Sequence, residues 1–242
     1  MDISVIIPMY NESDIITNTY DTLVSYMKND FGEGNFEIIF VSDGSTDGSE
    51  IIIDKKNNEP DVKVISYSPN KGKGYAVKQG MLSASGDFVL FTDSDLAYGT
   101  DIIKEIYDLY KLGDCDLVIG SRSICKNGYA GYTFLRKLMS KVYLKLVSLF
   151  AGFKHTDSQA GLKGFSNKSA KEIFNLCSEN GFSFDLEVLL LADKMNFKVK
   201  EIPAKVLIHK DSKVNPFQDA FKMLLELKKI KKRIKKINVK CQ

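Results

Sequence analysis

Cysteine, proline and long apolar runs are scarce in this chain of 242 residues, and each scarcity removes a class of protein. The four cysteines include no CxxC pair and lie far along the sequence from either histidine, which argues against a zinc site and a disulfide framework. Only 5 prolines in an otherwise ordinary composition exclude a collagen-like or disordered chain. We therefore expect a globular protein whose thiols stay reduced in the cytoplasm.

Membrane-spanning and secretory signals are also missing from the sequence. No segment approaches the roughly 18 uncharged apolar residues that indicate a transmembrane helix. Met1 is followed at once by Asp2 and a strand-like run, with no basic leader or small-residue cleavage site. These features predict that the protein remains in the cytoplasm.

Positive charge is abundant only at the end of the chain. The formal charge is +3 overall, but residues 222–240 hold nine lysines or arginines against Glu226 alone, a local charge of +8 that leaves −5 for the remainder. An apolar stripe recurs there at three-four spacing, formed by Met223, Leu227, Ile230, Ile234 and Ile237. A basic amphipathic helix of this kind suits an anionic membrane surface, although its stripe could instead pack on the protein itself. Nucleic acid is disfavoured, because the stretch lacks aromatics and the body is acidic.

Short apolar runs alternate with helix-length amphipathic segments in the first half of the chain. The expected strands are Ile3 to Ile7, Phe36 to Val41, Val62 to Ser66, Phe88 to Phe91 and Leu117 to Ile119. The expected helices between them are Asp14 to Met27, Ser49 to Lys56, Gly74 to Ala84 and Asp101 to Leu112. This alternation predicts an α/β fold with a mostly parallel sheet, whose ligands bind beyond the carboxyl ends of the strands.

The second half of the chain lacks the regular alternation of strands and helices. A long apolar-basic segment, Phe134 to Phe153, predicts a helix, and a strand is expected near Leu162 to Phe165. Helices near Lys168 to Cys177 and Asp185 to Met195, and a strand over Val199 to Val206, complete the body. We expect one domain over residues 1–215 and a basic amphipathic tail over residues 216–242.

The strongest local signal for chemistry is Asp93-Ser94-Asp95, directly after an apolar strand. Residues two apart in an extended segment face the same way, so both carboxylates can converge on one hard divalent cation. The same pattern also occurs in solvated loops, and its position after a strand favours the metal interpretation.

Two further loops follow predicted strands. Asp43 to Asp47 imitates part of a calcium loop, but it follows a strand rather than a helix and the final glutamate is absent, so we interpret it as a strand-to-helix loop. There Asp43 would face the ligand, while Thr46 or Asp47 caps the next helix. Asn70 to Gly74 combines glycines and lysines and could approach phosphates, although it is neither a Walker loop nor a dinucleotide fingerprint.

Together these residues resemble glycosyltransferase family 2, the inverting enzymes of the GT-A (Rossmann-like) fold, and within it the polyprenyl-phosphate hexose synthases. The resemblance covers residues 3 to about 215. It lies in seven motifs, namely VIIPMYNE from Val5, VSDGS from Val41, NKGKG from Asn70, DSD from Asp93, GSR from Gly120, DSQAGLK from Asp157 and FDLE from Phe184. The DSQAGLK and FDLE pair resembles the dolichyl-phosphate glucosyltransferase branch, although the amino-terminal membrane anchor usual in that branch is not expected here.

The resemblance implies a role for each matching residue on the donor side. The nucleotide would be held by Pro8, Tyr10, Glu12, Asp43, Lys73, Asp93 and Ser94, with Asp43 at the base edge. Asp95, with Asp93 beside it, would bind magnesium or manganese bridging the diphosphate. Independently of the family, a divalent cation would neutralise charge on a nucleoside diphosphate as it departs.

On the acceptor side the resemblance implies cationic groups for a lipid phosphate, namely Arg122, Arg136 and Ser140. An ionised phosphate needs no strong general base, so we expect positioning to supply much of the rate. Asp157 is the base candidate if the acceptor is instead a hydroxyl. Gln159, Lys163 and Glu187 would lie near the sugar and acceptor, and Ser212 and Lys213 belong to a loop over the diphosphate, where Asp211 departs from the family's glycine.

The sequence thus predicts a metal-dependent, inverting hexosyltransferase at the cytoplasmic face of the membrane. The expected donor is UDP-glucose, with GDP-mannose next, and the expected acceptor is polyprenyl phosphate. One alternative is the same fold with a sugar or polymer hydroxyl acceptor in cell-envelope synthesis and Asp157 as base. Less favoured are a sugar nucleotidyltransferase, whose glycine-rich signature is missing after the first strand, and a non-catalytic membrane adaptor. Formation of a homo-oligomer is left open.

Overall fold

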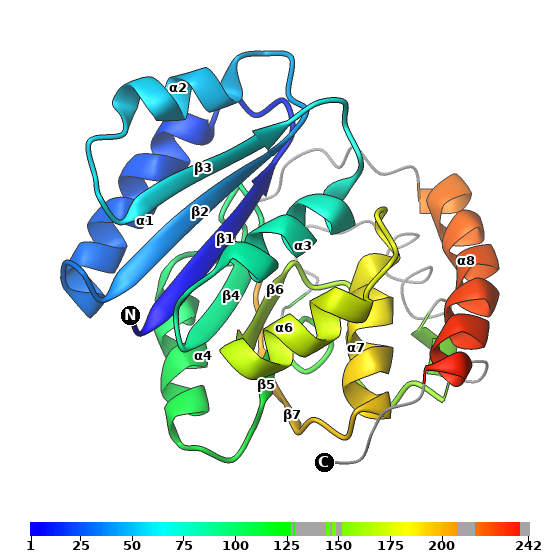
Figure 1. Ribbon diagram of the computed structural model, residues 1–242. Helices are drawn as coiled ribbons and strands as arrows, with labels where there is room; N and C mark the ends of the chain where they lie inside the picture. The colour runs from blue at the N-terminus through cyan, green and yellow to red at the C-terminus, as the bar shows by residue number, and fades with distance from the viewer. Residues whose placement is uncertain (127, 129–143, 146, 149–151, 208–215, 238–242) are drawn as a thin grey trace.

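The sheet is the centre of the protein. The computed structural model describes residues 1–126, 128, 144–145, 147–148, 152–207 and 216–237. Within this part, seven strands form one sheet in the order β3-β2-β1-β4-β6-β5-β7 (Figure 1). Their bounds are β1 Ile3–Met9, β2 Phe36–Asp43, β3 Val62–Tyr67, β4 Phe88–Thr92, β5 Leu117–Ser121, β6 Leu162–Ser166 and β7 Val199–Pro203.

The sheet is mostly parallel, as the alternation of strands and helices predicts. Strand β1 pairs in parallel with β2 and with β4, and β2 pairs in parallel with β3. Strand β6 is the exception, since it runs antiparallel between β4 and β5. This insertion brings the segment that precedes β6 to the carboxyl end of β4, which is the edge where polar residues were expected to gather.

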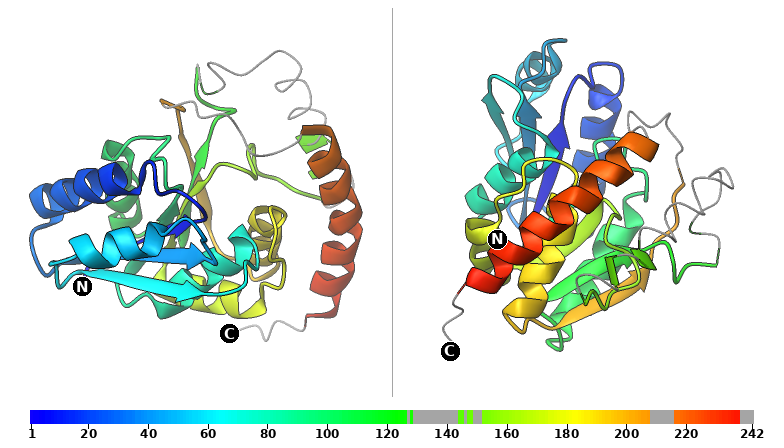
Figure 2. Two further views of the ribbon diagram at one scale, coloured as in Figure 1. Left: turned by 90° about the horizontal axis from the view of Figure 1, so that it is seen from above. Right: turned by 90° about the vertical axis from the view of Figure 1, so that its right-hand side faces the viewer.

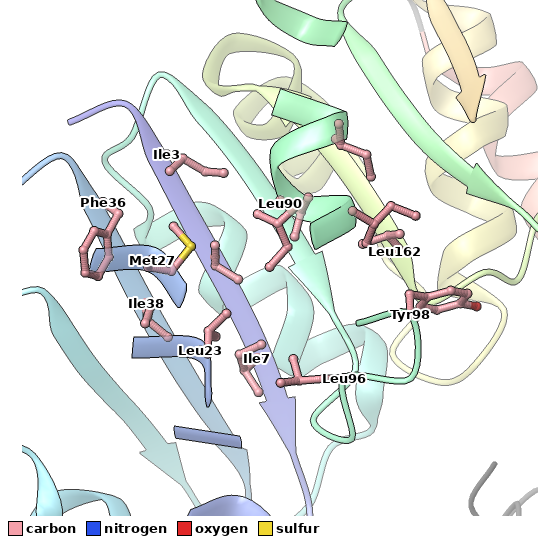
Figure 3. Packing of buried hydrophobic residues seen from close by; sticks show 14 of the residues in the cluster. Ile3, Ile7, Leu23, Met27, Phe36, Ile38, Leu90, Leu96, Tyr98 and Leu162 are labelled. Atoms are coloured by element: carbon pink, nitrogen blue, oxygen red, sulfur yellow. The ribbon is translucent and has the colours of Figure 1, made fainter. Parts of the chain in front are cut away.

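Helices cover both faces of the sheet because the central strands are apolar on both sides. Helices α1 (Ile16–Phe31), α2 (Ser49–Lys56) and α4 (Asp101–Lys111) pack on one face, against residues such as Ile7 and Leu90 (Figure 3). Helices α3 (Lys73–Ser83), α6 (Asn167–Leu176) and α7 (Phe184–Lys194) pack on the other, against residues such as Ile6 and Phe91. The carboxyl edge of the sheet, where the polar residues were expected, is therefore supported by a core that is packed on both faces.

Helix α7 explains the position of the basic tail. Its residues from Phe184 to Ala192 are all buried, and a helix that is buried on every side needs cover beyond the sheet. Helix α8 (Pro216–Lys236) supplies that cover on the outside of α7 (Figures 1 and 2). Leu227, Ile230 and Ile234 are buried in the same cluster as α7. The packing alternative for the apolar stripe is therefore what the described second half of α8 adopts.

The predicted elements of the first half match within a few residues. The span Ser49–Lys56 is identical, while α1 begins two residues late and runs on to Phe31. The expected strand over Val199 to Val206 ends at Pro203. Most of the helix expected over Phe134 to Phe153 lies outside the described residues. Among the helices that the structure describes, none is long and apolar enough to cross a bilayer.

Candidate active site

The loops after β1 and β2 are bound to each other at the carboxyl edge of the sheet. The backbone amides of Asn11 and Glu12 donate to the hydroxyls of Ser45 and Ser49, at 3.1 and 2.9 Å. Asp47 accepts from the amide of Ser49 at 3.0 Å, but the N-cap position of α2 is Gly48 and carries no side-chain cap, so the prediction that Thr46 or Asp47 caps this helix is wrong. The two loops that carry the donor-side residues therefore form one surface.

Asp43, at the end of β2, is buried and organises the loop between β3 and α3. Its carboxylate accepts from the Tyr67 hydroxyl at 2.8 Å, from Asn70 Nδ2 at 2.9 Å, and from the amides of Lys71 and Gly72 at 2.8 and 2.9 Å. Four hydrogen bonds match the roughly four lone-pair sites of a carboxylate. Asp43 thus fixes the loop whose next residue is the first residue of α3.

That first residue, Lys73, reaches across to the end of β4. Its Nζ lies 2.5 Å from Asp93 Oδ1. Burial lowers the pKa of Lys73, but the charges of Asp93 and Asp185 raise it more, so the net shift is upward and the ammonium stays charged. The loop after β3 and the DxD segment after β4 are thereby joined by an ion pair.

Asp95 lies in an environment where the positive charge of Lys73 compensates only in part for burial and neighbouring negative charge. Burial raises its pKa, and the neighbouring charge of Asp93 raises it further. The next residue, Leu96, holds a left-handed backbone with φ +49°, which is uncommon for a branched side chain. Backbone strain of this kind is found at functional sites. Two carboxylates that repel each other are a suitable oxygen donor pair for a hard divalent cation.

The segment that enters β6 completes this side of the site. A Cβ added to Gly161 would lie 2.1 Å from Asp93 Oδ2, so the backbone here approaches the carboxylate as closely as only glycine permits. Lys163 is fully buried, and its Nζ donates to Asp185 Oδ1 at 2.6 Å and to the Ala160 carbonyl at 2.7 Å. Burial raises the pKa of Asp185 against the opposing charges of Lys163 and Lys73.

Arg122 and Asp157 form a two-pronged ion pair on the opposite side of β6. Arg122 Nε and Nη2 donate to Asp157 Oδ2 and Oδ1 at 2.7 and 2.9 Å, and the amides of Arg122 and Gln159 donate to the same carboxylate. Asp157 is 1% exposed and Arg122 is 9% exposed. Burial alone would raise the pKa of Asp157, but the Arg122 charge outweighs it and holds that pKa below its usual range.

The residues before Asp157 are also held firmly. His155 Nε2 lies 3.0 Å from Asp193 Oδ1, and its Nδ1 lies 3.6 Å from Glu201 Oε1. Burial lowers the pKa of His155, but these two carboxylates raise it to about 9. The ring is therefore protonated at neutral pH, and it ties this segment to α7 and β7.

The remaining predicted site residues have varied surroundings. Pro8 is buried in β1, Tyr10 is 42% exposed at its end, and Glu12 begins the next loop. Ser94 is buried, and its carbonyl accepts from the Thr19 hydroxyl at 2.6 Å. Glu187 is fully buried and turned toward α8, away from the group around Asp93 and Asp157. Four predicted residues, Arg136, Ser140, Ser212 and Lys213, lie outside the described residues.

Several residues of the site escaped the sequence analysis. Tyr67 and Asn70 hold Asp43, and Asp185 is the partner of Lys163, although Asp185 stands in the same FDLE motif as Glu187. Ser158 is fully buried, and its hydroxyl is the one buried side-chain donor without a hydrogen bond in the described part of the chain. Asn70, Ser158 and Asp185 stand in the motifs NKGKG, DSQAGLK and FDLE, whereas Tyr67 lies in none of the quoted motifs. The pairings of these residues carried no sequence signal, because they are set by the folded chain.

The fold defines the class of protein. The glucosyl-3-phosphoglycerate synthase from Mycobacterium tuberculosis, solved in complex with Mn²⁺, UDP-glucose and phosphoglyceric acid, is similar to this structure with a TM-score of 0.69 at 19% identity, over 98% of this chain and 81% of that one. The architecture is that of a GT-A glycosyltransferase, with polar loops at the carboxyl ends of the strands.

Sequence comparisons identify the family. The model "Glycosyl transferase family 2" matches residues 4–174. The dolichyl-phosphate beta-glucosyltransferase of Drosophila melanogaster is 33% identical over 229 residues, which are 90% of this chain and 70% of that protein. The enzyme of the same name from Saccharomyces cerevisiae is 31% identical over 93% of this chain and 72% of its own length. The chain belongs to glycosyltransferase family 2, and this membership excludes the nucleotidyltransferase and adaptor alternatives.

Proposed function

We propose that this enzyme transfers glucose from UDP-glucose to a polyprenyl phosphate with inversion at the anomeric carbon, and that GDP-mannose is the next donor to test. The acceptor class and the sugar rest on the likeness to dolichyl-phosphate beta-glucosyltransferases. The uridine nucleotide is in keeping with the UDP-glucose bound by the structural relative from Mycobacterium tuberculosis.

The state of Asp157 is the observation that favours a phosphate acceptor over a hydroxyl. A hydroxyl acceptor needs a general base whose pKa lies near the working pH. Asp157 is bound through both oxygens to Arg122, and that charge keeps its pKa low. A phosphate monoester is already ionised at neutral pH, so it can attack without a base. We therefore assign Asp157 the role of orienting Arg122, which with Arg136 and Ser140 would bind the acceptor phosphate.

The donor half follows from the carboxylates at the end of β4. Asp95 and Asp93 would supply oxygen ligands that fit magnesium or manganese, and the upward pKa shift of Asp95, caused by burial and by the charge of Asp93, supports a cation there. When bound, the cation neutralises negative charge on the diphosphate. Lys73 keeps Asp93 in place, while Pro8, Tyr10, Glu12 and Ser94 are the residues proposed to hold the nucleoside. Asp43, whose carboxylate already accepts four hydrogen bonds, would contribute through the loop that it fixes. The anomeric C–O bond to the diphosphate breaks as a phosphate oxygen of the acceptor forms the new bond, and the electron pair leaves with the nucleoside diphosphate.

Helix α8 offers a way to reach a lipid substrate. Six lysines on its described half are exposed, namely Lys228, Lys229, Lys231, Lys232, Lys235 and Lys236. Leu227, Ile230 and Ile234 of its apolar stripe are buried against the enzyme, so the membrane contact that we propose is attraction between the lysines and anionic headgroups, at about 1 kcal/mol per residue near the surface. We propose peripheral attachment at the cytoplasmic face through this lysine surface.

Both parts of the proposal can be tested separately. Transfer is measured from a panel of nucleotide sugars to a short polyprenyl phosphate, with Mn²⁺, Mg²⁺ or EDTA. We expect UDP-glucose to be the best donor and EDTA to abolish transfer, and a preferred GDP donor or metal-independent transfer would contradict the proposal.

For the membrane, replacing Lys228, Lys231, Lys232 and Lys235 by glutamine should abolish sedimentation with phosphatidylserine vesicles. Replacing Lys55, Lys104, Lys111 and Lys168 outside α8 removes the same charge, and equal losses in both variants would contradict a role for α8.

A further inference from the structure

A buried carboxylate joins α8 to the rest of the enzyme. Glu187 on α7 has no exposed surface, and its Oε1 accepts from Arg233 of α8, whose Nε lies 3.0 Å away and whose Nη2 also donates to it. The same guanidinium donates to Glu179 Oε1 at 2.9 Å. Removing one partner of a buried ion pair leaves an uncompensated charge, so loss of Arg233 would leave Glu187 without its cation even though the apolar contacts of α8 remain.

The second oxygen of Glu187 holds the loop between α6 and α7. Oε2 accepts from the amides of Ser178 and Glu179 at 2.9 and 2.7 Å, and from the Cys177 thiol at 3.1 Å. One carboxylate therefore fixes α8 with one oxygen and this loop with the other. A displacement of Arg233 would move Glu187 and therefore the loop, because both are bound to the Glu187 carboxylate.

The loop in turn holds the start of α3. The carbonyl of Asn180 accepts from the amides of Gly74 and Tyr75 at 2.7 and 3.3 Å. A Cβ at Gly72 would meet this carbonyl at 2.4 Å, and one at Gly74 would meet the Glu179 carbonyl at 2.5 Å. The first turn of α3 is thus packed directly on backbone that Glu187 positions.

The start of α3 is part of the donor site. Lys73 is its first residue and pairs with Asp93 at 2.5 Å, and Gly72 donates to Asp43. We infer that Arg233 is a positioning residue for donor binding, acting through Glu187, the loop at residues 178–180 and the first turn of α3. This inference rests on the proposed function for the identity of the donor. It assigns the basic helix a role inside the enzyme in addition to its lysine surface.

Binding of UDP with Mn²⁺ to the full chain tests the inference without an acceptor. Arg233→Gln should weaken UDP binding about tenfold, and Arg233→Lys, which keeps the charge but loses the planar fork, should weaken it by about threefold. Lys104→Gln is the control, since Lys104 is a paired lysine on α4, far from these elements. In steady-state assays, KM for the donor should rise in Arg233→Gln, while kcat and KM for the acceptor change less than twofold relative to the control.

Hydrogen exchange decides the inference even if UDP is the wrong nucleotide. In Arg233→Gln the amides of Gly74 and Tyr75 should exchange faster, while the Ala84 amide, bonded to Gly80 at the other end of α3, should not change. If Arg233→Gln does not fold, the same amides are measured in Arg233→Lys, which keeps Glu187 intact and a positive charge beside it, and they should again exchange faster than in the wild type. Unchanged exchange at Gly74 and Tyr75, or equal UDP affinity in Arg233→Gln and Lys104→Gln, overturns the inference. Failure of the wild type to bind UDP contradicts only the choice of donor.

Discussion

Two aspartates on either side of β6 have opposite electrostatic environments. Asp95, after β4, has its pKa raised by burial and by the charge of Asp93. Asp157, before β6, has its pKa lowered because the charge of Arg122 outweighs its burial. The charge of Lys73 offsets these effects only in part at Asp95, whereas Asp157 is paired directly with Arg122.

The difference indicates distinct tasks for the two groups. Environments that push the pKa values of two carboxyl groups apart commonly separate their chemical roles. A cation bound at the end of β4, as we propose, would offset the repulsion between Asp93 and Asp95, whereas Asp157 already has its cation and is a poor proton acceptor. The following changes test this contrast, in order of expected effect.

Asp95→Asn should have the largest effect. Removing a carboxylate that would hold the cation deprives the departing diphosphate of its compensating positive charge, and this should lower kcat by about a thousandfold. Mn²⁺ at a hundred times its Kd should stabilise the wild type by about 2.7 kcal/mol, and the variant should lose this gain. Asp54→Asn on α2 is the charge-matched control. Full metal-dependent activity in Asp95→Asn would refute the assignment.

Gly161→Ala tests whether the geometry at Asp93 matters as much as its charge. The new methyl group would stand 2.1 Å from Asp93 Oδ2, so the carboxylate must move. A displacement of about 1 Å near reacting groups can lower the rate by about a hundredfold. Kinetics and Mn²⁺ titration of the folded variant measure this, and an unchanged Mn²⁺ affinity would show that Asp93 is not part of the metal site.

Asp157→Asn distinguishes an orienting residue from a base. As an orienting residue, its loss should lower the rate by about tenfold, since the amide oxygen can still accept from Arg122. Loss of a base should cost roughly a hundredfold or more. Added formate should restore no activity, and restoration by formate would support a hydroxyl acceptor activated by Asp157.

The same variant should change the dependence of stability on pH. Because the pKa of Asp157 is lower in the folded state, its pairing stabilises the protein above the unfolded pKa of about 3.9 and is lost as the pH falls through the folded value. The free energy of unfolding should therefore differ between wild type and Asp157→Asn by about 3 kcal/mol from pH 5 to 8. In urea titrations this difference should shrink below pH 4, and a constant difference down to pH 2 would contradict the ion pair.

Ser158→Ala should have the smallest effect. The hydroxyl is buried and has no hydrogen bond among the described residues, so its removal relieves an unsatisfied group. We expect stabilisation by about 0.5–1 kcal/mol in chemical denaturation, with activity within about twofold of wild type. A clear loss of activity would instead place this hydroxyl against a substrate.

Local patterns predicted the framework of the fold well. Alternating apolar runs located β1 to β5, since strands buried on both faces are continuous apolar segments bounded by polar loops. The antiparallel β6 was not distinguishable from its neighbours, because strand direction is decided by pairing with β4 and β5. Whether the apolar stripe of α8 packs on the protein or on a membrane was also left open, because this depends on α7 being buried on every side.

Prediction of the site was less complete for a similar reason. Asp93, Asp95 and Lys73 follow strands or begin a helix, so their position along the chain indicated a shared edge. The pairing of Arg122 with Asp157 spans 35 residues, and that of Glu187 with Arg233 spans 46. No local periodicity encodes such contacts. The sequence could therefore offer Asp157 as a base, whereas the structure surrounds it with an arginine and backbone amides.

A matched pair of acceptors tests the central claim most directly. Labelled UDP-glucose and Mn²⁺ are supplied to the enzyme with either a short polyprenyl phosphate or the corresponding polyprenol, which differs only in lacking the phosphate. The account predicts glucosylated lipid phosphate from the first and no transfer to the second. Transfer to the polyprenol at a comparable rate would contradict it, because that reaction would require a base that the Arg122–Asp157 pair does not provide.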